Sequence, residues 1–359
     1  MKSHFLTLDG LRGVAALAVL LFHRRWYVPG GHFLDHAYLA VDFFFGLSGF
    51  VIAHAYEQRL QQGSISLLDF VFIRAIRLYP LLVVSGALGG MAWIILGRHE
   101  PAIFLATFCA MLGLPTPFPI NVGEAASADT PFPINSPTWS LFFEMAINLL
   151  YASIVRFLTL PILSMLVALS FVWLVCVSLS SSTLGHQGVY YQLLLGGIPR
   201  TAFSFFVGVG IYRAAAAGRL PAMRFPVLGL ALLLIIVFSP PSSNGIWNVY
   251  YDLLCITLVF PTILVLGYQN TPSARLEDAA ALCGALSYPI YLLHYPFYVW
   301  YEEFSPLSRK SSIVAAAFLV PLITYCVLKW IDEPIRTALS RRLKSAQHRA
   351  IKPDLLEGR

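Results

Sequence analysis

An arginine and a histidine stand eleven residues apart in the first apolar stretch of the chain, at Arg12 and His23. Eleven steps of 100° make three helical turns plus 20°, so both side chains project from one helix face, about 16 Å apart along the axis. A guanidinium suits an anion, and an imidazole suits general-base chemistry. Taken singly, Arg12 is also explained as a snorkelling anchor at a helix end, and His23 as an interfacial histidine.

A second arginine pair begins another apolar stretch, at Arg74 and Arg77. Their i, i+3 spacing places the two guanidinium groups on one helix face. Two forked donors side by side match the oxygens of a phosphate or pyrophosphate. The alternative, that both arginines only set the orientation of the helix, explains one of them better than two facing together.

Two carboxylates lie within apolar sequence, at Asp42 and Glu144. If the first two apolar stretches form a hairpin, Asp42 reaches a depth similar to that of His23, where it would orient the imidazole for general-base catalysis. A structural hydrogen bond is the alternative for Asp42. For Glu144, three roles are open: catalysis, binding of a substrate hydroxyl, and an ion pair with an arginine.

Four further side chains are candidates for substrate contact. Trp139 and Ser140 begin the helix that carries Glu144, and Pro137 suits the first turn of that helix. Ser287 and His294 stand seven residues apart and so on one helix face. Polar contacts between helices explain Ser287 and His294 equally well.

The composition indicates the environment in which these residues act. Of 359 residues, 58% are hydrophobic and 12% are charged, about half the charged fraction of a soluble domain. The apolar residues fall in continuous blocks of roughly 17–25, the length of a membrane-spanning helix. Because backbone groups in hydrocarbon must bond within their own segment, such blocks predict an all-α polytopic membrane protein and not a barrel.

We predict about ten transmembrane helices in one domain, residues 1–340. The segment 103–114 is too short to cross a bilayer and is expected to be re-entrant or interfacial. The longest loop follows it at 115–136, and a basic tail occupies 341–359. The last residues of this tail, 356–359, resemble a tag or a cleavage remnant. The predicted spans are 7–25, 38–56, 71–96, 137–157, 161–179, 196–214, 224–240, 248–268, 284–303 and 312–332.

The distribution of charge predicts the orientation. The net charge is +6, and the basic residues gather in short loops and in the C-terminal tail. This pattern is typical of topology and of contact with anionic lipids, so we expect both termini in the cytoplasm and no nucleic-acid partner. No cleavage pattern follows the first apolar stretch, which is expected to remain as a span. The five cysteines lie singly, without the spacing of a metal site.

Several motifs, in order along nearly the whole chain, resemble the acyltransferase-3 family of membrane acyltransferases. They are Leu8-Asp9-Gly10-Leu11-Arg12-Gly13 with His23, Arg74-x-x-Arg77 followed by Leu78-Tyr79-Pro80, Pro137 to Glu144, Leu286 to His294, and Asp332-Glu333-Pro334. The resemblance implies a membrane O-acyltransferase, expected in a bacterial inner membrane. It would transfer an acyl group, usually acetyl, from cytoplasmic acyl-coenzyme A to a hydroxyl of a carbohydrate or glycolipid. We expect the form without a fused extracytoplasmic domain.

From this resemblance and the spacing of the residues, we hypothesise that Arg74, Arg77 and Arg12 bind the phosphates of acetyl-coenzyme A. His23 would act as general base on the acceptor hydroxyl, or as a transient acyl carrier, and no metal is expected. The main alternative is a transporter or flippase of a lipid-linked sugar, which would also hold charges inside the membrane. A structural or sensory protein would leave Arg74, Arg77, His23 and Glu144 without a reason.

Overall fold

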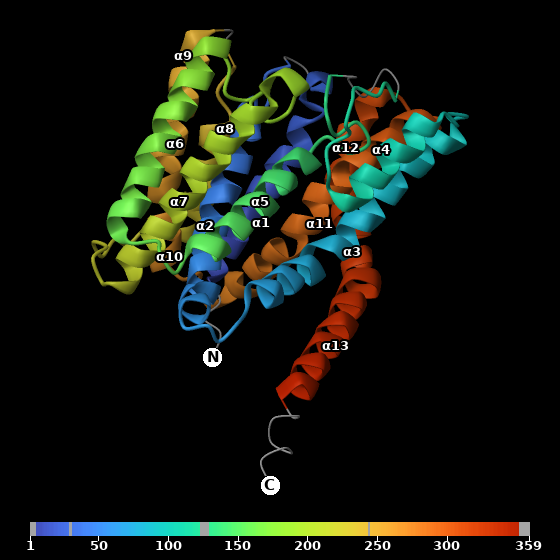
Figure 1. Ribbon diagram of the computed structural model, residues 1–359. Coiled ribbons are helices and arrows are strands. Elements are labelled where there is room, and N and C mark those ends of the chain that lie inside the picture. Colours follow the sequence, from blue (N-terminus) through green and yellow to red (C-terminus); the bar gives the residue numbers. More distant parts are fainter. Residues whose placement is uncertain (1–4, 29–30, 123–128, 243–244, 352–359) are drawn as a thin grey trace.

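The computed structural model describes residues 5–28, 31–122, 129–242 and 245–351, and every regular element in these ranges is helical (Figure 1). The short 3-10 helices lie at Arg25–Tyr27, Ala37–Leu39, Tyr191–Gly196 and Arg309–Ser311. Single π-helical turns join α9 to α10 (Cys255–Val259) and α12 to α13 (Leu328–Asp332). The α-helices are α1 (Leu6–Phe22), α2 (Ala40–Gln61), α3 (Leu67–Ile95), α4 (Pro101–Leu112), α5 (Thr138–Ile154), α6 (Leu160–Ser181), α7 (Gly197–Ala216), α8 (Val227–Phe238), α9 (Ile246–Leu254), α10 (Phe260–Gln269), α11 (Ala274–Phe304), α12 (Ser312–Val327) and α13 (Glu333–Ile351).

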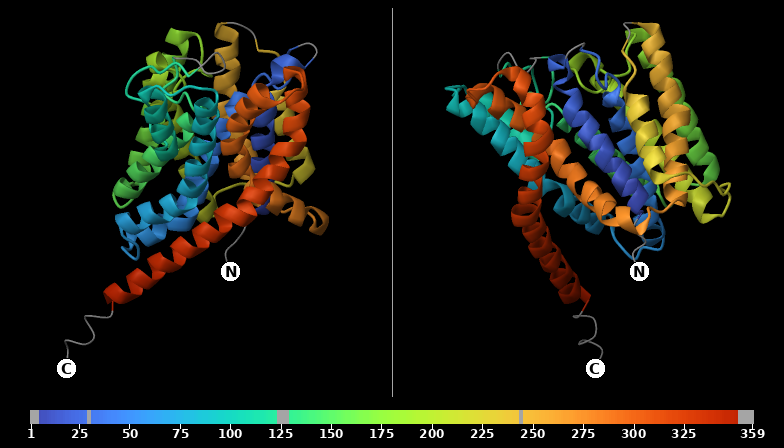
Figure 2. Two further views of the ribbon diagram at one scale, coloured as in Figure 1. Left: turned by 90° about the vertical axis from the view of Figure 1, so that its right-hand side faces the viewer. Right: turned by 180° about the vertical axis from the view of Figure 1, so that it is seen from behind.

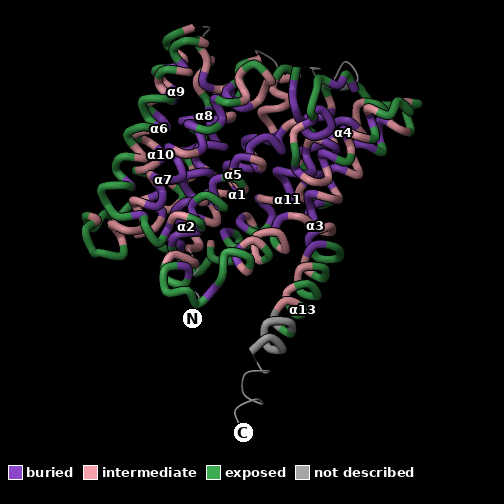
Figure 3. The backbone as a smooth tube through the Cα atoms, viewed as in Figure 1, coloured by how far each residue is buried: buried purple, intermediate pink, exposed green. Residues whose placement is uncertain are grey.

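The helices have the length and surface of an integral membrane protein. Among the described residues, five helical segments are long and apolar enough to cross a bilayer: Ala37–Gln61, Leu160–Ser181, Tyr191–Ala216, Ile246–Gln269 and Ser312–Leu343. Large apolar side chains cover the outer faces of the bundle, where Figure 3 shows exposed residues around a buried centre. All ten predicted spans coincide with helices, but the number of crossings stays a prediction. Helices α1 and α5 have 17 residues each and α8 has 12, and the longer α3 and α11 are also not among the five segments.

Several predicted boundaries differ from the observed ones. Helix α8 begins only at Val227, because Pro221 and Pro226 interrupt the segment before it. Helix α11 begins at Ala274, ten residues before the predicted span, so its first turns carry charged residues. The predicted short segment at 103–114 is a short helix, α4, which runs beside α3 (Figure 1) and ends at Gly113 in the left-handed conformation.

Glycines allow α1 and α11 to cross at close range. A Cβ atom added to Gly13 would lie 2.5 Å from Cβ of Cys283, and one added to Gly284 would lie 2.5 Å from Cβ of Asp9. Side chains at these positions would force the helices apart, as at other small-residue crossings in membranes. The crossing therefore places Arg12 against the backbone of α11.

Glycines also allow α2 and α7 to pack at close range. A Cβ atom added to Gly49 would lie 2.0 Å from the carbonyl oxygen of Phe205, and one added to Gly208 would lie 2.0 Å from that of Gly46. The close contact brings Arg200, on the first turn of α7, toward the first turn of α2.

A proline within α11 allows the long loop before α5 to bind to this helix. Pro296 has no N–H, so the carbonyl of Leu292 lacks its ordinary partner four residues on. The side-chain amide of Asn135 donates to this carbonyl at 2.9 Å. The start of α5, with Trp139 and Ser140, is therefore held beside the middle of α11.

The bundle has two ends that matter for the site. Helix α1 begins, and α13 projects as a single arm, at one end, which we call the near end (Figure 2). Helix α1 finishes, with His23 as its C-terminal cap, at the opposite or far end (Figure 1). The predicted boundary at residue 341 falls inside α13, which continues from Glu333 to Ile351.

Candidate active site

Two cavities lie between the helices, and they share part of their lining. The first, which we call the arginine cavity, has an empty volume of about 790 Å³ and contains Arg12, Arg74 and Arg77 in its walls. The second, which we call the histidine cavity, has an empty volume of about 1490 Å³ and is lined by His23 and residues of the far end. Val41 and Tyr291 line both cavities, so the two cavities adjoin at these residues.

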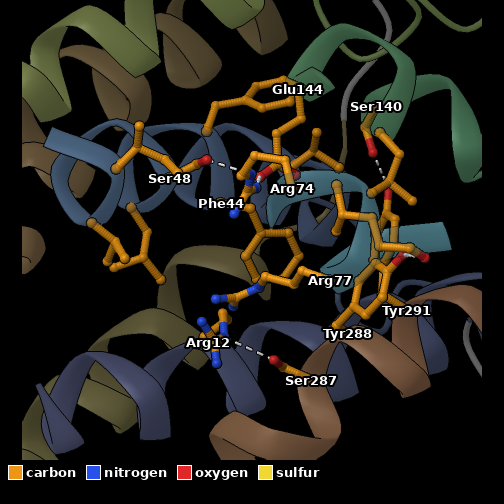
Figure 4. A pocket seen from close by; sticks show the side chains of 17 residues that line it. Arg12, Phe44, Ser48, Arg74, Arg77, Ser140, Glu144, Ser287, Tyr288 and Tyr291 are labelled. Atoms are coloured by element: carbon orange, nitrogen blue, oxygen red, sulfur yellow. Dashed lines mark hydrogen bonds and ion pairs between the residues drawn. The ribbon is translucent and has the colours of Figure 1, made fainter. Parts of the chain in front are cut away.

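In the arginine cavity, the crossing of α1 and α11 fixes Arg12. Its Nε donates to Ser287 Oγ at 2.8 Å (Figure 4). Its Nη2 donates to the carbonyl of Gly284 at 2.8 Å. One turn earlier on α1, Asp9 forms an ion pair with Arg12 at 3.1 Å. Ser287 thus serves as a support for Arg12.

Glu144 of α5 reaches into the arginine cavity and binds two groups. Nη2 of Arg74 lies 3.3 Å from Glu144 Oε1, and Ser48 Oγ donates to the same oxygen at 2.8 Å. Of the three roles that the sequence left open for Glu144, the structure shows the ion pair with an arginine. Ser48 was not among the predicted residues, and a single serine in an apolar helix gave little signal for it.

The arginine cavity carries an excess of positive charge. Arg12 is paired with Asp9 and Arg74 with Glu144, whereas Arg77 forms no ion pair within the described ranges of the chain. Figure 4 shows all three arginines turned into one cavity from α1 and α3. A group of guanidinium forks with one charge uncompensated suits an anionic ligand such as a phosphate.

His23 enters the histidine cavity with one ring nitrogen free for chemistry. Its Nδ1 lies 2.9 Å from the carbonyl of Val19. Since a carbonyl only accepts, Nδ1 carries the proton, and Nε2 keeps its lone pair. This tautomer is the one that a general base acting through Nε2 needs.

The charged groups near the mouth of the histidine cavity compensate one another. Arg25 Nε lies 2.8 Å from Asp35 Oδ1, and the second carboxylate oxygen of Asp35 accepts from His32 and from the backbone N–H of Ser242. Burial raises the pKa of the Asp35 carboxyl. The hydrogen bonds and the Arg25 charge together lower this pKa by more, so it lies below its ordinary value. Asp35 therefore stays ionised beside Arg25.

Of the two roles that the sequence left open for Asp42, the structure shows a structural bond and not the contact with His23. Asp42 instead binds Arg200, whose Nη2 lies 2.7 Å from Oδ2 and whose Nε lies 2.9 Å from Oδ1. The α2–α7 crossing brings this cation to Asp42, and a buried carboxylate is stabilised more by a guanidinium than by a neutral imidazole. Arg200 is a charge near the start of the apolar stretch 196–214, whose other charge, Arg213, stands near its end, so the criterion that selected Arg12 would also have found Arg200.

Arg200 stabilises the wall of the histidine cavity through several hydrogen bonds. Its remaining N–H groups donate to backbone carbonyls of Tyr38, Leu184, Gly185 and Gln187. Its guanidinium also lies 5.2 Å from the ring centre of Trp139. The pair of Asp42 and Arg200 therefore holds α2, α7, α5 and the loop after α6 in one arrangement.

The structure divides the other predicted substrate residues between different places. Trp139 lines the histidine cavity. Ser140 lines the arginine cavity, where its hydroxyl lies 2.7 Å from that of Tyr291. His294 is fully buried and lines neither cavity, although its ring centre lies 4.9 Å from that of His23. Tyr291, which the motif contained but the prediction did not select, lies in the wall between the cavities.

Comparison with known proteins identifies the family. The acyltransferase-3 family, described as an acyltransferase domain, matches residues 5–330. The chain belongs to this family. It is 25% identical to a putative membrane-bound transacylase, BcsY, of Komagataeibacter xylinus over 94% of this chain and 86% of that protein. It is 38% identical to protein 2 of the picA locus of Rhizobium radiobacter, over 41% of this chain and 81% of that protein.

Membership in the acyltransferase-3 family makes this protein an enzyme of acyl transfer, and it implies an acyl donor and an acceptor. No solved structure matches the chain. In the part of the chain that the structure describes, no three histidine, cysteine, aspartate or glutamate side chains converge as metal ligands. The two cavities are therefore the places where we look for the donor and the acceptor.

Proposed function

We propose that this acyltransferase moves an acetyl group from acetyl-coenzyme A, bound at the near end, to a hydroxyl of an uncharged carbohydrate or glycolipid at the far end. The observation that carries this proposal is the shared wall of the two cavities. Arginines line one cavity, His23 lines the other, and Val41 and Tyr291 belong to both.

The charge of the arginine cavity supports its role as the donor site. Arg77 offers an uncompensated guanidinium to the phosphates of coenzyme A, with Arg12 and Arg74 beside it. The pantetheine arm would then extend past Tyr291 toward His23, which lies about 16 Å farther along α1 than Arg12. A thioester reaches the far end in this way without its nucleotide crossing the bundle.

His23 is then the general base. Its Nε2 takes the proton of the acceptor hydroxyl while the hydroxyl oxygen forms a bond to the carbonyl carbon of the thioester. The carbon–sulfur bond breaks, and its electron pair leaves with the sulfur of coenzyme A. The proton on His23 finally neutralises that thiolate, which restores the base for the next cycle. Asp42 supports this site indirectly, by holding Arg200 and the cavity wall.

The histidine cavity favours an uncharged acceptor. Arg25 is paired with Asp35, and Arg200 with Asp42, so neither cation is available for an anionic sugar. The lining also presents hydroxyl and amide groups and aromatic rings, the side chains that bind sugars without charge: Trp26, Ser136, Trp139, Ser182, Thr183, Tyr190, Ser242 and Asn248. The basic tail supports a near end facing the cytoplasm of a bacterial inner membrane.

Release of free coenzyme A tests the function. The protein in nanodiscs, given acetyl-coenzyme A and methyl β-D-glucopyranoside as a neutral hydroxyl probe, should release the thiol and form an acetyl ester on the sugar. The charged methyl glucuronoside should be a much poorer acceptor. If the glucuronoside were acetylated as well as the glucoside, the uncharged acceptor would be the wrong class.

The matched variants are His23→Ala and His36→Ala, since His36 is buried but lies outside both cavities. His23→Ala should lower the rate of transfer by about 100-fold or more, as expected for loss of a general base. Binding of coenzyme A should not change, because His23 does not line the arginine cavity. Transfer at the normal rate by His23→Ala would refute His23 as the base.

A further inference from the structure

The short turn that follows α1 places a tryptophan at the opening of the histidine cavity. Trp26 belongs to the 3-10 turn Arg25–Tyr27 and lines this cavity, yet 65% of its surface is exposed. A side chain that is both exposed and part of a cavity wall stands where the cavity opens. Three residues of backbone span at most about 11 Å, so this opening lies near His23.

The ring of Trp26 is held in place by Arg25. The guanidinium carbon of Arg25 lies 3.9 Å from the ring centre of Trp26 and 4.0 Å from that of Phe22. Arg25 is fixed in turn by its ion pair with Asp35 and by a hydrogen bond from Nη1 to the carbonyl of Phe22 at 3.1 Å. Because the cation covers one face of the indole, the exposed surface lies mainly on the opposite face and the edges. Trp26 therefore offers a fixed aromatic surface.

Anchoring at the membrane surface is the other reason for an exposed tryptophan, since tryptophans gather at both membrane–water interfaces. Trp247 fits that role, because it is 74% exposed and lines neither cavity. Trp26 differs from Trp247 in two ways: it forms part of the cavity wall, and a paired cation fixes its ring. A membrane anchor needs neither feature, so the position of Trp26 points to a ligand in the cavity.

The histidine cavity is larger than one sugar ring requires. Its empty volume of about 1490 Å³, the open mouth included, exceeds the roughly 300–1000 Å³ of pockets that enclose drug-sized ligands. A single sugar with its hydroxyl at His23 Nε2 would leave the opening empty. In a longer glycan, the next sugar unit would lie toward the opening, beside Trp26. The apolar C–H face of a sugar ring packs well on an aromatic ring, which gives a large contact area and loses little entropy.

We propose that Trp26 is a specificity-determining residue whose indole binds the sugar unit next to the one that is acylated. The acceptor is then a glycan of at least two linked units and not a single sugar. This inference rests on the proposed function, since it takes His23 as the place of transfer. Trp26 does not touch the reacting atoms, so its contribution is to the binding of the longer acceptor and not to the chemical step.

The test compares one sugar with two disaccharides that contain the same sugar and differ in linkage. The acceptors are methyl β-D-glucopyranoside, methyl β-cellobioside and methyl β-maltoside, and kcat and KM are measured for each in nanodiscs at saturating acetyl-coenzyme A. The variants are Trp26→Ala, Trp26→Phe, which keeps an aromatic ring beside Arg25, and Trp247→Ala as the matched control. The decisive quantity is the ratio of kcat/KM between disaccharide and glucoside, because a purely structural role of Trp26 would not change it.

We expect the wild type to use at least one disaccharide about 10-fold better than the glucoside, the effect of one well-placed aromatic anchor. Trp26→Ala should remove this advantage by raising KM for the disaccharide, with far less effect on the glucoside. Trp26→Phe should keep most of the advantage, and Trp247→Ala should keep all of it.

Three results would overturn the role of Trp26. They are a wild type that prefers neither disaccharide, a preference that survives in Trp26→Ala, and equal losses for glucoside and disaccharide in Trp26→Ala. Wild-type protein that released no coenzyme A with any of the three acceptors would instead refute the proposed function itself.

Discussion

Arg77 differs from the other two arginines of the arginine cavity because no carboxylate in the described ranges pairs with it. We therefore predict that Arg77→Ala raises the Kd for coenzyme A by about 10-fold or more, the cost of a lost charge-assisted contact to phosphate. Titration calorimetry in nanodiscs measures this change. The effect should shrink as salt is added, because salt screens such contacts.

Arg98→Ala is the matched control for this prediction, because Arg98 is exposed just beyond α3 and pairs with exposed Glu100. It should leave the Kd unchanged. Arg74→Ala is a less direct probe, since it also leaves Glu144 unpaired in the cavity wall. Unchanged affinity in Arg77→Ala would contradict the assignment of this cavity to phosphates.

The pair of Asp42 and Arg200 gives a prediction about stability. Asp42→Ala leaves a buried guanidinium without its carboxylate, so it should destabilise the fold by about 3–5 kcal/mol. A lower thermal midpoint in detergent would show this. The double variant Asp42→Ala with Arg200→Met should recover much of the loss, since no charge then stays buried alone. Loss of transfer at a normal midpoint would instead point to a direct role of Asp42 in the chemistry.

Individual residues show how much of the candidate site could be predicted from the sequence. The search for charged residues within apolar stretches found Arg12, Arg74, Arg77 and Glu144, and the structure brings all four to one cavity. The same principle failed to pair Asp42 correctly, because its partner lies 158 residues away on α7. A depth argument places two side chains at one level of a membrane, but it does not say which helices are neighbours.

At the scale of helices, α2 and α11 form the wall between the two cavities through Val41 and Tyr291. If the thioester passes this wall, Val41→Trp should block it and lower kcat by about 10-fold or more, while the Kd for coenzyme A stays the same. Overpacking costs about 1–3 kcal/mol, so Val41→Phe and Val41→Ala complete the series with smaller strain. Coenzyme A release and binding are measured on each.

Val51→Trp is the matched control for this series, because Val51 lies on the same helix and lines only the arginine cavity. It should affect binding of coenzyme A more than kcat. Transfer at the full rate by Val41→Trp would mean that the acyl group takes another route.

The existence of the helices followed from hydrophobic blocks, but their ends and contacts did not. Helix α8 is shorter than its predicted span and α11 is longer, because proline chemistry and charge at helix ends are not visible in a hydropathy pattern. The glycines at the α1–α11 and α2–α7 crossings are visible in the sequence, yet which glycine meets which helix is a property of the assembled bundle.

For the whole molecule, the start of α1 and the arm of α13 lie at one end, opposite the histidine cavity (Figure 2). If the near end faces the cytoplasm, a cysteine at exposed Gln62 should resist an impermeant maleimide in intact cells and react after lysis. A cysteine at Trp247, which is 74% exposed at the far end, should react in intact cells. The reverse pattern would place the arginine cavity outside the cell and contradict a cytoplasmic donor.

The sequence by itself determined that the protein is helical, that it lies in a membrane, and which family it belongs to, because composition and local motifs encode these properties directly. It also determined the spacing of Arg12 and His23, since helix geometry fixes it. Only the tertiary structure decided that the arginines and His23 line two cavities with a common wall, and that Asp42 binds Arg200. The reason is physical: a single helix sets the direction and depth of its side chains, whereas a cavity exists only between helices that have already packed.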